Sequence, residues 1–233
     1  MHPRQKVSKD NSGNILLGIK RSLPVALSVL TYGISFGVLA RQAGLSVTET
    51  LLMSSLVFAG TSQFVALEMW QSPLPIAAIV FTTFAINLRH ILMGAALSPL
   101  FSHRSSWQAY SCYFFLNDES WALTMSEVSQ GGQSAGFFFG SGLTIFVAFV
   151  TSTVTGQLIG QTLSEPRQWG LDFAFTAVFI ALLVSLWGGK ESFIPWLTAA
   201  IVAVVSAYWL PSAGYILLGG LAGSLVGVMC DAG

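Results

Sequence analysis

The 233-residue chain carries only 9% charged residues, against about 25% in ordinary globular proteins, and its mean hydropathy is +0.69. So few ionic side chains cannot cover the surface of a soluble protein of this length, and the composition predicts an integral membrane protein. The formal net charge is zero, which excludes the basic face that nucleic-acid binding requires.

The first 20 residues are mostly polar, and we predict that they form a short cytoplasmic tail. Five basic residues precede or open the first apolar run: Arg4, Lys6, Lys9, Lys20 and Arg21. Basic residues gather on the cytoplasmic side of membrane proteins, so this run favours a cytoplasmic N-terminus. The apolar run itself is too long for the core of a signal peptide, which has about 7–15 residues. We therefore predict that it is the first transmembrane helix.

The rest of the chain consists of apolar runs long enough to cross a bilayer, for which a helix needs about 20 residues. The predicted spans are 22–42, 49–70, 74–100, 107–128, 136–162, 171–187, 192–209 and 212–230. The fold class predicted from them is all-α, a polytopic transmembrane helix bundle of about seven to eight spans, within a range of six to eight. Some of these spans are expected to break in mid-membrane. Residues 21–230 then form a single transmembrane transport domain.

Two local patterns indicate how the helices begin and pack. Ser46 and Glu49 have the spacing of a capping box at the start of the second span, which predicts a structural role for Glu49. Glycines four residues apart allow two helices to approach closely in lipid. Such glycines are Gly33/Gly37, Gly136/Gly140, Gly156/Gly160 and Gly219/Gly223/Gly227.

The first polar cluster lies in the middle of the second predicted span, at Gly60, Thr61, Ser62 and Gln63. A glycine followed by three polar side chains is unfavourable in a helix that faces lipid. The pattern favours an opened or bent helix that presents carbonyl, hydroxyl and amide groups to a ligand. The alternative is hydrogen bonding between helices, which contributes about 0.6–2 kcal/mol per contact.

Two further clusters place charges inside predicted spans. They are Asn87, Arg89 and His90 in the third span, and Asn117, Asp118 and Glu119 near the middle of the fourth. A charge near the bilayer centre costs at least about 2.5–3.5 kcal/mol, so it normally faces a partner or a water-filled cavity. An arginine cannot lose its proton there and needs an anionic partner. Arg89 can form a structural ion pair with Asp118 or Glu119, or bind an anionic substrate group, and the pattern leaves both roles open.

The order and spacing of these clusters resemble one known family. The sequences Phe-Ala-Gly-Thr-Ser-Gln-Phe at 58–64, Asn-Leu-Arg-His at 87–90 and Asn-Asp-Glu at 117–119 are similar to those of the AzlC family. The stretch from Gly170 to Val184 and the helix after Pro211 are similar as well, so the resemblance covers about 15–230. The family usually has Ala where this chain has Thr61. AzlC proteins are the large subunits of bacterial branched-chain amino-acid exporters.

The resemblance implies a transporter rather than an enzyme. It implies gradient-driven export of valine, leucine and isoleucine across the bacterial cytoplasmic (inner) membrane, together with a small membrane partner of the AzlD type. We expect no cofactor and no metal. The chain has no Gly-x-x-x-x-Gly-Lys-Ser/Thr phosphate loop, and its cysteines have no metal-ligand spacing.

A branched-chain amino acid is a zwitterion with an apolar side chain, so we expect the three clusters to bind its two charged ends. Arg89, or free backbone N–H groups near Gly60 or Asn87, would bind the carboxylate. Asp118 or Glu119 would bind the ammonium group and take up the coupling proton. The expected substrate or proton pathway comprises Gly60, Thr61, Ser62, Gln63, Asn87, Arg89, His90, Asn117, Asp118 and Glu119. The expected apolar wall comprises Phe58, Phe64 and Phe115.

Two other functions fit parts of the sequence. Gly33-Ile34-Ser35-Phe36-Gly37 matches the Gly-x-Ser-x-Gly pattern of serine hydrolases, with His90 as a possible base. That pattern acts on a strand–turn–helix elbow, which a transmembrane helix does not provide. The other alternative is a non-transporting structural or channel subunit, in which the polar clusters serve assembly alone.

Overall fold

The computed structural model describes residues 11–102, 104–132, 134–162, 193–209 and 214–231, with the single positions 180 and 189. All regular secondary structure in these ranges is helical, which confirms the predicted all-α class. The predicted span 171–187, apart from position 180, lies outside the described residues, as do the first ten residues of the tail. The same holds for most of the family-like stretch from Gly170 to Val184.

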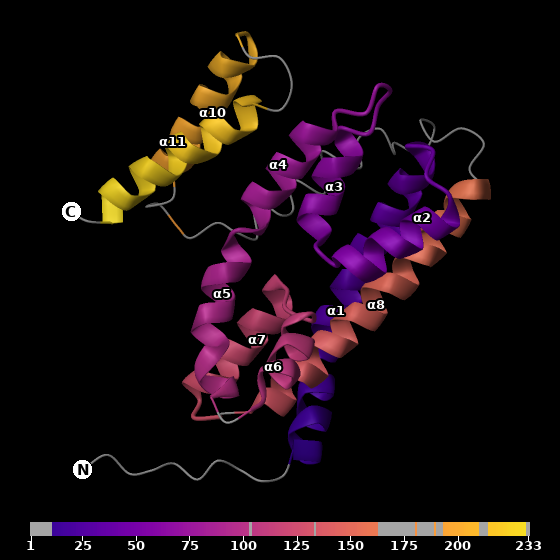
Figure 1. The fold of residues 1–233 in the computed structure, drawn as a ribbon, viewed down its shortest axis with the longest axis vertical. Coiled ribbons are helices and arrows are strands. Elements are labelled where there is room, and N and C mark those ends of the chain that lie inside the picture. The colour runs from indigo at the N-terminus through magenta and orange to yellow at the C-terminus, as the bar shows by residue number, and fades with distance from the viewer. Residues whose placement is uncertain are drawn as a thin grey trace. The chain divides into compact units, whose positions relative to one another are not determined.

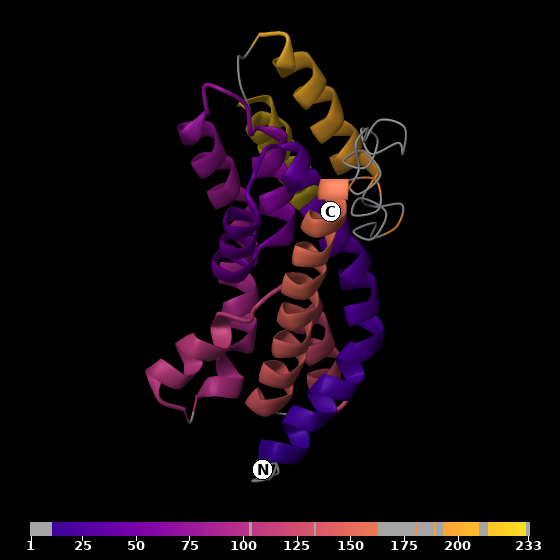
Figure 2. The same ribbon diagram turned by 90° about the vertical axis from the view of Figure 1, so that its right-hand side faces the viewer.

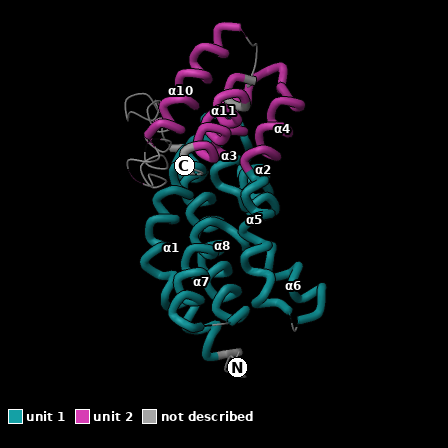
Figure 3. Tube along the Cα trace, turned by 90° about the vertical axis from the view of Figure 1, so that its left-hand side faces the viewer, with its two compact units in different colours: residues 1–63, 87–166 teal, residues 64–86, 167–233 magenta. Residues whose placement is uncertain are grey.

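The chain divides into two compact units, which Figure 3 distinguishes by colour. Unit 1 comprises Met1–Gln63 and Asn87–Pro166, and unit 2 comprises Phe64–Ile86 and Arg167–Gly233. All ten predicted pathway residues fall within unit 1.

Three helical segments in the described residues are long and apolar enough to cross a membrane: Gly13–Gln42, Ile76–Phe101 and Ala135–Gln161. They correspond to the first, third and fifth predicted spans. Shorter apolar helices cover Val47–Val57, Phe193–Ala207 and Leu218–Met229. The structure therefore agrees with a multi-pass membrane protein.

Helix α1 (Asn11–Gln42) and helix α8 (Ala135–Thr162) lie side by side along their lengths and form the centre of unit 1 (Figures 1 and 2). They run parallel in a constant register, since Gly18 meets Phe137 and Gly37 meets Gly156. A Cβ atom added at Gly37 or Gly156 would overlap a backbone carbonyl of the other helix. This confirms that these glycines allow close helix packing.

The second predicted span is interrupted. It consists of α2 (Val47–Leu52), a π-helix (η1, Met53–Val57) and α3 (Gly60–Glu68). Phe58, between them, adopts a left-handed conformation with φ 46° and ψ 42°. Ser46 and Glu49 form the predicted capping box at the start of α2. The predicted opening of this helix at the first polar cluster is confirmed.

The third predicted span is divided at Leu88 into α4 (Ile76–Asn87) and α5 (Arg89–Leu97), followed by a short 3-10 helix (η2, Ser98–Phe101). The fourth predicted span is not a continuous helix. It consists of α6 (Ser106–Tyr113) and α7 (Asp118–Ser129). Asn117 has an extended backbone and its side chain accepts a hydrogen bond from the Ser120 backbone N–H, so it starts a new helix. The polar cluster 117–119 therefore opens a helix, whereas hydropathy placed it within one.

In unit 2, α10 (Phe193–Ala207) and α11 (Gly214–Asp231) form an antiparallel pair. Gly219 packs against Ala203 and Gly223 against Ala199, and Cβ atoms added at either glycine would lie 2.7–2.8 Å from the partner helix. This pair confirms the packing role predicted for Gly219 and Gly223.

Candidate substrate site

Arg89 connects two helix starts in unit 1. Its Nη2 atom lies 2.8 Å from Asp118 Oδ2 in the first turn of α7, and it donates a 3.3 Å hydrogen bond to Thr61 Oγ1 in the first turn of α3. The Arg89 side chain is 33% exposed and the Asp118 side chain 47% exposed. The pair is therefore accessible from outside the packed core, as a group that binds a substrate must be.

The start of α3 is packed closely against α1. A Cβ atom at Gly60 would lie 2.7 Å from Tyr32 Cε1 and 3.3 Å from the Tyr32 hydroxyl. The same hydroxyl interacts with Thr61 and lies within the electrostatic range of Arg89, Asp118 and Glu119. Tyr32 thus belongs to the site, and Gly60 is needed because any side chain there would displace the tyrosine ring.

Gln63 and Ser62 form hydrogen bonds with backbone groups at the helix break. Gln63 Oε1 accepts a 3.1 Å hydrogen bond from the Ala59 N–H, and Ser62 Oγ donates a 2.9 Å bond to the Ala59 carbonyl. Asn87 Nδ2 donates a 3.2 Å bond to Ser62 Oγ, which ties the end of α4 to the break. These residues stabilise the break, and Gln63 is almost fully buried, with 1% of its surface exposed.

The residues Asn117, Asp118 and Glu119 have different roles. The Asn117 side chain caps α7 through Ser120, whose hydroxyl accepts a 3.1 Å bond from the Asn117 N–H in return. Asp118 binds Arg89. Glu119 lies in the same first turn and interacts electrostatically with Asp118 and Arg89. The negative charge of Asp118 is favoured both by the dipole of α7 and by the Arg89 guanidinium.

Three polar atoms of this site are buried and have no hydrogen-bond partner among the described residues: Asn87 Oδ1, Arg89 Nε and Asn117 Nδ2. One is an acceptor and two are donors. Buried polar groups in proteins normally have partners, so these atoms are suited to hydrogen-bond a ligand that carries both acceptors and donors.

The predicted apolar wall is partly assembled. Phe58 packs edge-on against Phe146 at 5.0 Å between ring centroids, and Phe115 packs against the same ring at 5.5 Å. Phe114 joins this ring cluster, and Phe149 packs against Phe58. Phe64 is fully buried in α3. Phe58 and Phe115 therefore belong to one aromatic surface, and Phe58 adjoins the break at Gly60.

The hydrolase pattern does not form an elbow. Ser35 lies within the continuous helix α1, and its hydroxyl donates a 3.0 Å bond to the Thr31 carbonyl one turn earlier. His90 Nδ1 lies 3.2 Å from the Asn87 carbonyl oxygen. His90 thus lies beside Asn87 at the candidate site.

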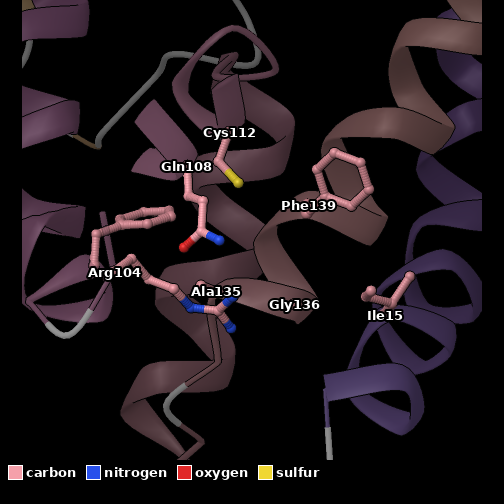
Figure 4. Close-up of a pocket in the computed structure, with 8 residues that line it drawn as sticks. Ile15, Arg104, Gln108, Cys112, Ala135, Gly136 and Phe139 are labelled. Carbon is pink, nitrogen blue, oxygen red and sulfur yellow. The ribbon is translucent and has the colours of Figure 1, made fainter. Parts of the chain in front are cut away.

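A separate cavity of about 70 Å³ lies within unit 1 (Figure 4). It is lined by Ile15, Phe101, Arg104, Gln108, Cys112, Ala135, Gly136 and Phe139. Arg104, Gln108 and Cys112 border it on one side, and Ile15 with Phe139 on the other. None of the predicted pathway residues lines it, so the predicted site and this cavity are different features.

Two residues that belong to the polar interior of unit 1 were not singled out by sequence reasoning. Tyr32 stands one position before Gly33 in the small-residue pattern of α1, which was the available signal. Gln157 lies next to Gly156 in α8 and is fully buried. An amide within an otherwise apolar helix was a signal for it, but its partners lie more than 100 positions away in the sequence.

Comparison with known proteins identifies the family. The family model described as AzlC protein matches residues 24–163. An uncharacterised membrane protein of Archaeoglobus fulgidus is 31% identical to this chain, over 75% of this chain's length and 76% of its own length. The inner membrane protein YgaZ of Escherichia coli is 26% identical over 90% and 87%, respectively. The branched-chain amino acid transport protein AzlC of Bacillus subtilis is 25% identical over 79% and 72%. No solved structure matches the chain.

Proposed function

The chain belongs to the AzlC family, and from that premise we propose that it is the large subunit of a bacterial exporter of branched-chain amino acids. The name of the Bacillus subtilis relative supports the substrate class. In this proposal residues 21–230 form one transport domain in the cytoplasmic membrane, with the N-terminus in the cytoplasm. A small AzlD-type membrane protein is its partner, and valine, leucine and isoleucine are its substrates.

The observation that carries the proposal is the position of Arg89 between two helix starts. A substrate carboxylate can bind the Arg89 guanidinium and, at the same time, the first N–H groups of α3, which lack intrahelical partners. The buried Nε atom of Arg89 provides a further donor. A broken helix whose N-terminus points at an anionic group is a recurrent feature of transporter sites.

The ammonium group and side chain of the substrate have matching partners nearby. Asn87 Oδ1 is a buried acceptor without a partner in the described part of the chain, and Asp118 carries the compensating charge. Phe58 and Phe115 offer an aromatic surface to the branched aliphatic side chain. A single amino acid, which is a zwitterion with an apolar side chain, thus uses all three kinds of group.

Binding and proton coupling are linked through Asp118. Arg89 binds Asp118 in the structure, and a substrate carboxylate would compete for the same guanidinium. Asp118 is then released to bind the substrate ammonium or to take up a proton, and Glu119 is the second carboxylate available for this. Binding the zwitterion leaves the net charge of the site unchanged, whereas proton uptake by a carboxylate raises it by one. A proton gradient can therefore drive transport only if the carboxylate is protonated in one state and not in the other.

The test is efflux of labelled valine from proteoliposomes that contain the chain with and without its small partner. Arg89→Ala should abolish efflux, whereas Lys20→Ala should not. Lys20 is an exposed basic residue in the first third of α1. Asp118→Asn should abolish proton-driven efflux while the complex still assembles. If the wild-type complex moves no branched-chain amino acid, the proposed substrate class is wrong.

A further inference from the structure

A row of polar side chains extends from the substrate site through unit 1. It consists of Asn87, Ser62, Gln63, Ser54, Thr153, Thr50 and Gln157, all of which except Asn87 have at most 1% of their surface exposed. We infer that this row, the polar seam, is a hydrated path between the Arg89–Asp118 site and the loop Ala43–Ser46, and that the coupling proton enters through it. Its role in transport rests on the proposed function, whereas its hydration does not.

At the site end the seam is linked by consecutive hydrogen bonds. Asn87 donates to Ser62, and Ser62 donates to the Ala59 carbonyl. The Ala59 N–H in turn donates to Gln63 Oε1, and Gln63 Nε2 lies 3.5 Å from Ser54 Oγ in the π-helix. The helix break therefore places polar groups on both sides of Phe58 in contact with one another.

At the loop end the seam is anchored by Gln157. Its Nε2 atom donates a 2.7 Å bond to the Leu45 carbonyl and a 3.2 Å bond to Thr50 Oγ1. Leu45 belongs to the connection between α1 and α2, where the chain leaves the first span. The amide thus joins α8 to the end of the bundle opposite the N-terminus.

The two hydrogen-bonded ends of the seam approach each other at the level of Thr153 and Ser54. Helix α8 runs parallel to α1, and α2 returns from the loop that follows α1, so α2 and α8 run in opposite directions. Thr153 is one turn before Gln157, and Ser54 is one turn after Thr50. Because Gln157 contacts Thr50, the next turn of each helix places Thr153 and Ser54 at the same level. Thr153 therefore stands between the two hydrogen-bonded ends of the seam.

Three atoms of the seam are unpaired in the part of the chain that the structure describes. Gln157 Oε1, Thr153 Oγ1 and Asn87 Oδ1 are buried and have no hydrogen-bond partner within the described ranges. Hydrogen bonds that served only to hold helices together would satisfy these groups. Buried water occupies polar sites that have room for it and offer two to four polar partners, and the inferred path requires such sites along the seam.

The seam crosses a substantial part of the membrane. Tyr32, which packs at the site, lies ten residues before Gln42 at the end of α1, and this corresponds to about 15 Å of helix. Fully buried apolar residues such as Phe36 and Leu39 occupy the same part of α1. A hydrated path through this apolar region lets a proton reach Asp118 or Glu119 from the face opposite the N-terminus.

The first test measures water access. In the full chain with Cys112 and Cys230 replaced by serine, single cysteines are introduced as Thr153→Cys, Ser54→Cys and, as the control, Ile145→Cys. Ile145 lies on the same helix as Thr153 and is 2% exposed, but has apolar character. Membranes are treated with Ag⁺, and the thiols that remain are counted after denaturation. Because the thiolate is the reactive form, Thr153→Cys and Ser54→Cys should react about tenfold faster than Ile145→Cys.

Equal rates at the three positions, in variants with wild-type expression and elution profiles, would overturn the hydrated path.

The second test is transport. Thr153→Val should lower proton-driven valine efflux and spare valine–valine exchange, whereas Thr151→Val, at an exposed position of α8, should change neither. Loss of both activities, or retention of both, would overturn the inference that the coupling proton enters through the polar seam. If the wild type moves no valine while Thr153→Cys still reacts, the proposed function fails and the hydrated path stands.

Discussion

Arg89 Nη2 lies 2.8 Å from Asp118 Oδ2, although 28 residues separate the two along the chain. The same nitrogen donates to Thr61, so one guanidinium joins the first turns of α3 and α7. Helix N-termini carry partial positive charge, and the arginine adds a full one. Asp118 balances this charge, and under the proposed function a substrate carboxylate would compete with it for the guanidinium.

The ion pair should show coupling in a double-mutant cycle. Arg89→Ala and Asp118→Ala should each abolish valine efflux, and the double variant should be more thermally stable than the sum of the two single effects predicts. Both side chains are partly exposed, so we expect a coupling free energy toward the lower end of about 0.5–3 kcal/mol. Thermal unfolding of the four purified proteins measures it. Strict additivity would mean that the pair contributes nothing to stability.

Gly60→Ala should impair transport through Tyr32. The new Cβ would lie 2.7 Å from Tyr32 Cε1, so either the ring or the start of α3 must move. Gly94→Ala in α5 is the matched control, because its Cβ would meet its nearest neighbour at 3.8 Å. Efflux should fall in the first variant alone and should partly recover in Gly60→Ala/Tyr32→Ala. Equal efflux in Gly60→Ala and Gly94→Ala would contradict the close packing.

The contact between α1 and α8 should tolerate no side chain at Gly156. Overpacking of this kind destabilises proteins by about 1–3 kcal/mol, and here the obstacle is the Ile34 backbone carbonyl. Gly220→Ala in α11 is the control, since no atom lies within 4 Å of its added Cβ. We expect a lower melting temperature for Gly156→Ala and an unchanged or slightly higher one for Gly220→Ala. The reverse order would show that the two helices are not in contact at Gly156.

Substitutions of Asn117 should separate capping from ligand binding. Asn117→Ala removes the N-cap of α7 and should cost about 1 kcal/mol of stability, whereas Asn117→Ser keeps a capping oxygen. Both remove the buried Nδ2 donor. If that donor binds substrate, both variants should need more valine for half-maximal efflux, but only Asn117→Ala should unfold at a lower temperature. Wild-type valine dependence in Asn117→Ser would exclude Nδ2 from the site.

Ser35 should have no catalytic role. Its hydroxyl is bonded to the Thr31 carbonyl inside α1, and no strand–turn–helix elbow surrounds it. Ser35→Ala should therefore retain efflux, and a serine-reactive phosphonate should not label the wild-type protein at this position. Covalent labelling of Ser35, detected by mass spectrometry of the peptide, would reopen the hydrolase interpretation.

Local features of the protein could be predicted from the sequence because they depend on neighbouring residues. The low charge and long apolar runs predicted a helical membrane protein, because the free energies of transferring individual residues into lipid sum along a segment. The capping box at Ser46 and Glu49 and the helix opening at Gly60 also follow from residues within one turn. The polar clusters identified Arg89 and Asp118 as candidates, and left their pairing open.

Tertiary structure decided which of these groups meet. Hydropathy averages over a window, so it joined α6 and α7 into one span, although the Asn117 cap separates them. It also gave no sign that Tyr32 packs on Gly60, or that Gln157 reaches Leu45 from 112 positions away. Such contacts depend on the parallel register of α1 and α8, which glycine backbones set through close approach. The register of two helices is a property of their packing, so it cannot be predicted from the residues of one local stretch of sequence.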